Sequence, residues 1–274
     1  MKRFIKLSLS LLFFAATQVI RISKKLIGRP VPGRVVILYY HAVTDRCRRR
    51  FGSQMGILKS LALLVSADFK GPIMAGKLYA AVTFDDAFQS VLENALDEMR
   101  SRQIPCTIFV PTAFLGTHPR WDAEPGGYDQ HETIMTAEQL REIPADLVTL
   151  GSHTRTHPHL LELDSSIAEE ELVASRRELE AVIQRPAKLC SLPYGEYSDE
   201  ILDLCRKAGY ERVYSVSPTL AMLTPDEYLT GRVLVSPNDW GLEFRLKALG
   251  AYSWHPVAST LKRTMRRWFA RSRN

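Results

Sequence analysis

The segment that decides the fold is YAAVTFDDAFQSVLENALDEMR, residues 79–100. An apolar, strand-like run ends at Phe84, the carboxylates of Asp85 and Asp86 follow directly, and apolar residues then recur at helical spacing. A buried strand that passes into a helix is typical of parallel sheets, whose strands are connected by helices. The two adjacent acids either begin the helix as a cap and first turn or belong to a site at the end of the strand.

The rest of the chain repeats this alternation. Six further strand-like runs lie at residues 34–43, 106–110, 147–150, 189–192, 212–216 and 229–235. Helical spacing or capping residues lie at 91–103, from 136, at 164–184 and at 198–207. Strands that alternate with helices predict an α/β fold with a parallel sheet, and seven strands favour a closed or nearly closed barrel over a short open sheet.

Charge is distributed unevenly along the 274 residues, whose net charge is +6. Lys and Arg concentrate in the first 50 residues, where Asp45 is the one acid, and in residues 244–274, which have no acid. The stretch between them is acidic. A nucleic-acid-binding protein would carry its basic residues as a stripe over the folded body, so we expect no nucleic-acid partner.

Both ends combine basic and apolar residues. Residues 7–20 (LSLSLLFFAATQVI) form an apolar run that is shorter than the ~20 residues of a spanning helix. Residues 1–30 therefore predict a membrane-associating segment, with a cleavable signal peptide as the alternative. In residues 244–274, Val257, Leu261, Met265, Trp268 and Phe269 recur at helical spacing opposite basic residues.

This C-terminal pattern suits a helix on an anionic membrane, or equally a terminal helix packed on the domain. The predicted organisation is an N-terminal segment over 1–30, a catalytic domain over 31–243 and a basic amphipathic segment over 244–274. An anionic membrane surface, contacted through both termini, is the expected partner besides the substrate.

The four cysteines, Cys47, Cys106, Cys190 and Cys205, show no CxxC motif. Cys106 and Cys190 lie in apolar runs, which is typical of reduced core thiols and not of a disulfide framework. We therefore expect a membrane-associated protein at the cytoplasmic face of the inner membrane, with an exported form as the alternative.

Polar residues follow several of the predicted strands at their carboxyl ends. His41 ends the first strand, Asp85 and Asp86 the second, and His153 the fourth, with His157 four residues later. Because the carboxyl ends of parallel strands meet at one mouth, these side chains are expected to lie together.

Two histidines at i and i+4 with one carboxylate form a three-ligand set that leaves a metal ion an open position for water. A second carboxylate can then act as general base. Singly, each signal has an ordinary explanation, since His-x-x-x-His is often incidental and an Asp pair often begins a helix. Their coincidence at strand ends of the same polarity favours a site.

The motifs TFDDAFQSVLENAL, LGSHTRTHPHL and LPYGEYS occur in this order between about Val35 and Val235. They resemble the successive motifs of the polysaccharide deacetylases, carbohydrate esterase family four. The resemblance implies a distorted (β/α) barrel with about seven parallel strands and a divalent metal, most often zinc. It also implies removal of N- or O-acetyl groups from sugars.

The same resemblance assigns roles to residues of this chain. Asp86, His153 and His157 match the family's metal ligands, and Asp85 matches its catalytic base. Tyr194 lies where the family lends a backbone N–H to the oxyanion.

Three departures from the family pattern are present. The stretch Cys190-Ser191-Leu192 replaces the motif that carries an Arg beside the base, Ala87 replaces a Gly, and the late Leu-x-His that supplies the general acid is missing. Similar family members place the acid on a first-strand histidine, here His41, which could otherwise be a core histidine. Arg232 could brace the site in place of the missing Arg, or form a surface ion pair.

Aromatic residues of the loop after the third strand, Trp121, Tyr128 and His131, could form a sugar-stacking wall or simply pin the loop. The expected function is a metal-dependent hydrolase that deacetylates N-acetylated sugars of a polysaccharide or lipid-linked glycan. The alternatives are a deformylase of a lipid-linked amino sugar and a catalytically silent glycan-binding or scaffold protein of the same fold.

Overall fold

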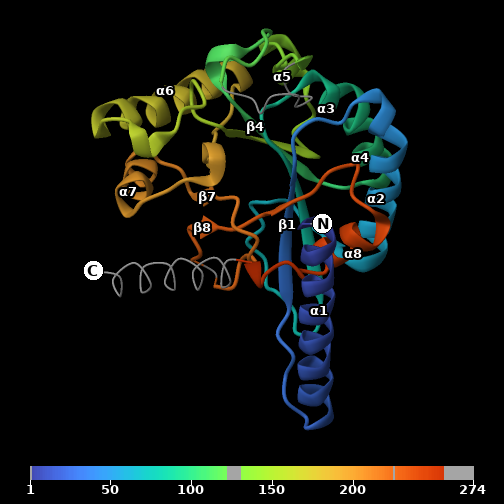
Figure 1. Ribbon diagram of the computed structural model, residues 1–274. Coiled ribbons are helices and arrows are strands. Elements are labelled where there is room, and N and C mark those ends of the chain that lie inside the picture. The colour runs from blue at the N-terminus through green and yellow to red at the C-terminus, as the bar shows by residue number, and fades with distance from the viewer. Residues whose placement is uncertain (1, 122–130, 225, 256–274) are drawn as a thin grey trace, which may run out of the picture.

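A parallel sheet curled into a half-barrel forms the centre of the molecule (Figure 1), in a computed structural model that describes residues 2–121, 131–224 and 226–255. The strands are β1 (Arg34–Tyr40), β2 (Leu63–Leu64), β3 (Leu78–Phe84), β4 (Cys106–Val110), β5 (Val148–Ser152), β6 (Leu189–Ser191), β7 (Arg212–Tyr214), β8 (Leu229–Thr230) and β9 (Val233–Leu234). Their order is β8-β7-β6-β5-β4-β3-β1-β9, and β2 pairs with β3. All named strand pairs are parallel, which confirms the predicted α/β barrel.

The last predicted strand, residues 229–235, is in fact two short strands. β8 and β9 lie at opposite ends of the strand order, so the chain crosses the seam of the barrel at Gly231 and Arg232. A Cβ atom at Gly231 would collide with the Thr219 hydroxyl and the Ser217 carbonyl oxygen, so this crossing requires a glycine. The two-residue β2 is too short to leave a sequence pattern, and it too was not predicted.

Helices surround the sheet (Figure 1). They are α1 (Lys2–Leu26), α2 (Arg48–Leu61), α3 (Gln89–Asn94), α4 (Leu96–Arg102), α5 (Ala137–Glu142), α6 (Ser165–Ile183), α7 (Asp199–Lys207) and α8 (Gly241–Ala248). The helix expected at 91–103 is divided at Ala95 into α3 and α4. α5 begins with a capping box between Thr136 and Gln139, which agrees with a helix start at residue 136.

Alternating residues of β1 reach two different cores. Val36, Leu38 and Tyr40 pack in the cluster that also contains buried residues of α2 and α8, whereas Val35 and Ile37 pack in a second cluster with residues of β3, β4 and β7. This alternation follows from the two-residue period of a strand. The second cluster fills the barrel interior below the ends of the strands.

Helices lie near both ends of the described chain. The apolar N-terminal run belongs to the 25-residue helix α1, in which Arg3–Leu26 is long and apolar enough, by length and composition, to cross a bilayer. The predicted C-terminal segment starts inside α8, where Phe244, Leu246 and Ala248 are buried in the main core. The domain therefore continues past residue 243, because these side chains face the sheet; the amphipathic pattern from Val257 lies outside the described residues.

The packing of α8 in the core can be tested by measuring its contribution to the free energy of unfolding. Phe244→Ala should lower the free energy of unfolding by about 3–5 kcal/mol, because it leaves a cavity in the core. Leu242→Ala, on the half-exposed side of the same helix, should change it by less than about 1 kcal/mol. Chemical denaturation of both variants is the measurement, and equal effects would contradict the assignment of α8 to the core.

Candidate active site

Six predicted site residues lie at the carboxyl ends of β1, β3, β5 and β6. Asp85 and Asp86 follow β3, His153 and His157 follow β5, and Tyr194 lies in the 3-10 turn Pro193–Gly195 after β6. His41 follows β1, whose last residue, Tyr40, is level with Phe84 of β3. The parallel register thus brings segments that are far apart in sequence to one mouth.

Asp86, His153 and His157 form a buried cluster. One ligand atom from each residue lies within 4.8 Å of the others, as in a group that can hold a metal ion. The Nε2 atoms of His153 and His157 lie 3.5 and 3.6 Å from Asp86 Oδ1. Two imidazole nitrogens and one carboxylate oxygen are a donor set typical of zinc with an open coordination position.

The surroundings of His153 and His157 favour a role as metal ligands. His153 Nδ1 lies 2.7 Å from the carbonyl oxygen of Ser191, a bond that requires a proton on Nδ1 and leaves the Nε2 lone pair directed toward Asp86. Burial lowers the pKa of His153, and burial together with His153 lowers the pKa of His157 well below its usual value. Both rings are therefore neutral, as metal ligands must be.

The backbone around the cluster is held in an unusual conformation. Asp86, His157 and Tyr194 have φ angles of 69°, 57° and 57°, in the left-handed region that favours glycine. Ala87, at the position where a Gly was expected, has φ 49°. Each such residue costs on the order of 1–3 kcal/mol, and strain of this kind concentrates at functional sites.

Asp85 faces a different partner, the guanidinium of Arg232. Arg232 Nη1 donates to Asp85 Oδ1 at 2.7 Å and Nη2 donates to Asp85 Oδ2 at 2.8 Å. The other three donors go to Thr83 Oγ1, Ser191 Oγ and the Ser215 carbonyl oxygen. All five N–H groups of this fully buried side chain thus have acceptors.

This ion pair sets the charge of Asp85. Burial alone raises the pKa of the carboxyl, but the charge and hydrogen bonds of Arg232 outweigh burial and bring the pKa to about 2. Asp85 is therefore ionised at neutral pH and can accept a proton.

The sequence left Arg232 undecided between a bracing residue and a surface ion pair, and its complete burial excludes the surface pair. Ser191, in the stretch that replaces the family's Arg motif, had no predicted role. It accepts from Arg232 through its hydroxyl and from His153 through its carbonyl oxygen, and so connects the two halves of the site. For Arg232, the signal available in the sequence was its position in the middle of an apolar, strand-like run.

His41 lies at the same mouth. Its ring is 5.7 Å from that of Tyr39, which contacts the Arg232 guanidinium at 4.7 Å. A proton on the His41 ring would lower the pKa values of Asp85, His153 and His157, so the ring lies within electrostatic reach of all three. A position among these polar groups does not resemble that of an isolated core histidine.

Two of the three loop aromatics are described. Trp121 stacks on the His157 ring at 4.3 Å and packs against Phe114, so it covers a candidate ligand. His131 lines the cavity described below, and Tyr128 lies outside the described residues. The Tyr194 ring stacks on the His159 ring, with 3.7 Å between the ring centroids.

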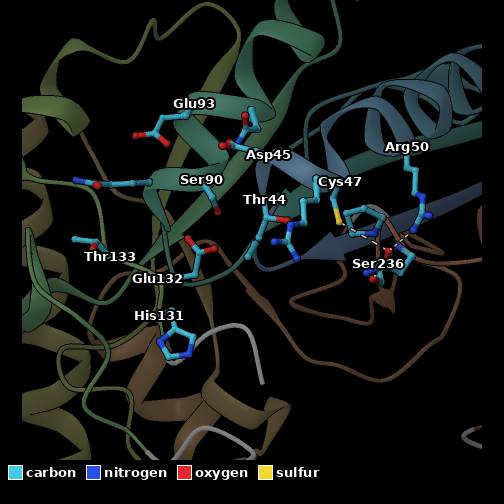
Figure 2. A pocket seen from close by; sticks show the side chains of 16 residues that line it. Thr44, Asp45, Cys47, Arg50, Ser90, Glu93, His131, Glu132, Thr133 and Ser236 are labelled. Carbon is cyan, nitrogen blue, oxygen red and sulfur yellow. Dashed lines mark hydrogen bonds between the residues drawn. The ribbon is translucent and has the colours of Figure 1, made fainter. Parts of the chain in front are cut away.

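A cavity of about 860 Å³ adjoins the mouth. It is lined by residues that follow β1, β3 and β9 and by His131, Glu132 and Thr133. Figure 2 shows Ser90, Glu93 and Thr133 on one side of it and Cys47, Arg50 and Ser236 on the other. The six site residues do not line it, but its volume lies within the ~300–1,000 Å³ of typical ligand clefts.

Solved structures of known proteins share this fold. IcaB from Ammonifex degensii superposes with a TM-score of 0.66 at 23% identity, over 81% of this chain and 98% of that one. The Streptococcus pyogenes deacetylase PplD gives a TM-score of 0.64 at 18% identity, over 80% and 99%.

Relatives at the sequence level include YxkH of Bacillus subtilis (strain 168), 24% identical over 81% of this chain and 76% of the relative. The chitooligosaccharide deacetylase of Bradyrhizobium sp. (strain ANU 289) is 26% identical over 53% of this chain and 59% of the relative. The poly-beta-1,6-N-acetyl-D-glucosamine N-deacetylase of Staphylococcus aureus (strain MSSA476) is 21% identical over 57% and 54%. The chain thus spans between half and two thirds of the last two relatives.

The family model described as polysaccharide deacetylase matches residues 75–213, which include β3 to β6, the start of β7 and five of the six residues at the mouth. With these motifs and this fold, the chain belongs to the polysaccharide deacetylase family.

Proposed function

We propose that this protein is a metal-dependent hydrolase that removes acetyl groups from N-acetylated sugars of a polysaccharide or lipid-linked glycan. The observation that carries the proposal is the Asp86, His153 and His157 cluster beside an ionised Asp85 that Arg232 fixes in place. The names of the Bradyrhizobium and Staphylococcus relatives support N-acetylated glucosamine chains as the substrate class.

The donor set fits a divalent ion, and zinc is the one that we propose. When bound, such an ion polarises the acetyl carbonyl group and lowers the pKa of water. The residues that would hold it are Asp86, His153 and His157, and the Ser191 carbonyl orients the His153 ring.

Three residues of the chain carry the proton transfers and the developing charge. Asp85 takes the proton from the water that attacks the acetyl carbonyl, and the backbone N–H of Tyr194 donates to the oxyanion. His41 protonates the nitrogen as the carbon–nitrogen bond breaks, which releases acetate and the free amine. The cavity beside the mouth offers space for neighbouring sugars of a chain.

A catalytically silent glycan-binding or scaffold protein is a rival from another class, because the family's usual Arg and its late His are both missing. Arg232 weighs against the first reason, since its Nη1 and Nη2 donate to Asp85; His41 is the acid that we propose in place of the late His. A deformylase would use the same residues, so only substrates distinguish it.

We propose that the protein acts at a membrane, attached through the exposed apolar face of α1. The C-terminal part of the predicted attachment lies outside the described residues. The cytoplasmic face of the inner membrane agrees with four free cysteines, three of them buried; an exported form would retain the same fold.

The metal site is tested by measuring the metal content of the purified protein. The purified protein should contain about one equivalent of a divalent ion, and His153→Ala or His157→Ala should weaken binding by more than about 100-fold, because a direct ligand is lost. His159→Ala, which changes the histidine stacked on Tyr194, should retain the ion. Metal analysis by mass spectrometry after dialysis is the measurement, and equal retention in all variants would contradict the ligand assignment.

The activity is tested by acetate release from N-acetylglucosamine oligosaccharides with added divalent ions. Asp85→Asn should lower kcat by about 10²–10⁴-fold while the ion stays bound, because the amide cannot accept the proton. A matching panel of N-formylated oligosaccharides separates the deformylase. Normal turnover by Asp85→Asn would refute the base role, and formate release without acetate release would favour the alternative.

The bracing role of Arg232 is tested by the pH dependence of kcat/KM. Arg232→Met removes the main influence that lowers the Asp85 pKa and leaves burial, which raises it. Because the base must be ionised, activity should be lost at a higher pH as the solution is acidified than in the unmodified protein. Arg232→Lys keeps a charge and should shift the profile less; superimposable profiles for all three proteins would contradict the role.

A further inference from the structure

The outward face of α1 is an apolar surface without a covering element in the described part of the chain. Ile5, Leu12, Val19, Ile22 and Leu26 recur at intervals of three, four and seven residues, which places them on one side of the helix. The exposed fraction of these five residues lies between 53% and 81%. Figure 1 shows that the second half of α1 extends beyond the body of the protein.

The first half of α1 is attached to the domain on its opposite face. Ser10 is fully buried and accepts a hydrogen bond of 2.9 Å from Trp254 Nε1. Near the start of the helix, Arg3 pairs with Glu243 and the Phe4 ring lies 5.0 Å from that of Trp240. A helix with these contacts lies along the domain; crossing a bilayer would require all of them to break.

The far end of α1 forms one wall of a basic pocket of about 620 Å³. Its charged lining residues are Arg21, Lys25 and Arg29, and the remaining lining residues are uncharged. Two Arg21 nitrogens lie within hydrogen-bond distance of the Pro32 and Gly76 carbonyl oxygens, which position the guanidinium. We refer to this feature as the basic pocket.

Acidic side chains that could neutralise this pocket are missing from the sequence nearby. Residues 1–44 and 69–84, which contain its walls, have no Asp or Glu. The excess charge also affects a neighbour, since burial and the charge of Arg21 lower the pKa of Arg34 to about 10. The positive potential therefore favours an anion.

We infer that α1 docks in the plane of an anionic phospholipid bilayer, with its outward face among the acyl chains and a lipid phosphate in the basic pocket. An exposed apolar face with basic residues on the other side of the same helix is the pattern of a helix that lies in the membrane interface. The charge complementarity selects anionic lipid in particular. This inference deepens the proposed membrane attachment and does not depend on the proposed chemistry.

The test is flotation of the full chain with vesicles of phosphatidylcholine alone or mixed with phosphatidylglycerol. The protein should float with the mixed vesicles and only weakly with phosphatidylcholine. Changing Arg21, Lys25 and Arg29 together to Gln should weaken binding to the mixed vesicles at least about tenfold, because each basic residue near the surface contributes. A control with Arg100, Arg141 and Lys207 changed to Gln loses the same charge elsewhere and should bind like the unmodified chain.

A second variant tests how much the apolar face of α1 contributes to vesicle binding. Val19→Ser with Leu26→Ser leaves every charge in place and should reduce flotation with both kinds of vesicle; both side chains are exposed, so the fold should persist. Thermal unfolding and acetate release from a soluble oligosaccharide check each variant independently of membrane binding. Loss of flotation with unchanged unfolding supports the inference whether or not acetate is released.

Three results would overturn the inference. The first is unchanged flotation of the Arg21, Lys25 and Arg29 variant. The second is release of the protein by inorganic phosphate at low millimolar concentration, which would assign the pocket to a free anion. The third is retention of the protein in cell membranes after alkaline carbonate extraction, which would assign a spanning helix.

Discussion

The buried ion pair between Arg232 and Asp85 is the interaction on which the rest of the site depends. Moving a guanidinium and a carboxylate out of water is costly, and the cost is offset only when the geometry is good and the remaining donors are satisfied. Here all five donors of Arg232 have acceptors, and the rings of Tyr39, Phe109 and Tyr214 surround the cation within 4.7 to 5.7 Å. The pair thus links the seam of the barrel to β3.

Ser191 connects this ion pair to the cluster of Asp86, His153 and His157. One residue accepts from Arg232 through its hydroxyl and from His153 through its carbonyl oxygen. The orientation of the proposed base and that of a proposed ligand are therefore coupled through a single serine. Left-handed backbone at Asp86, Ala87, His157 and Tyr194 adds strain, which the packed surroundings must compensate. An alanine at residue 87 carries a conformational cost that a glycine would avoid.

Much of the fold could be predicted because its signals are local. Apolar runs located six of the seven predicted strands as single strands, and the polar residues at their ends indicated where the mouth would lie. The remaining features depend on contacts between residues that are far apart in sequence, which a local pattern does not reveal. Arg232 and Asp85 are 147 residues apart, so the partner of the arginine could not be read from either segment. α8 was not predicted for a different reason: its apolar and polar residues show no one-sided pattern, so the local sequence does not indicate which side is buried.

The seam at Gly231 and Arg232 has a consequence for how the protein is made. A ribosome releases Asp85 long before it releases Arg232, so the nascent chain holds the acid without its counter-charge until nearly the whole barrel has been synthesised. A partly synthesised barrel can therefore form most of its sheet, but the Asp85 carboxylate still lacks the positive charge of Arg232. The ion pair between Asp85 and Arg232 can therefore form only after the residues that connect β8 and β9 have been synthesised.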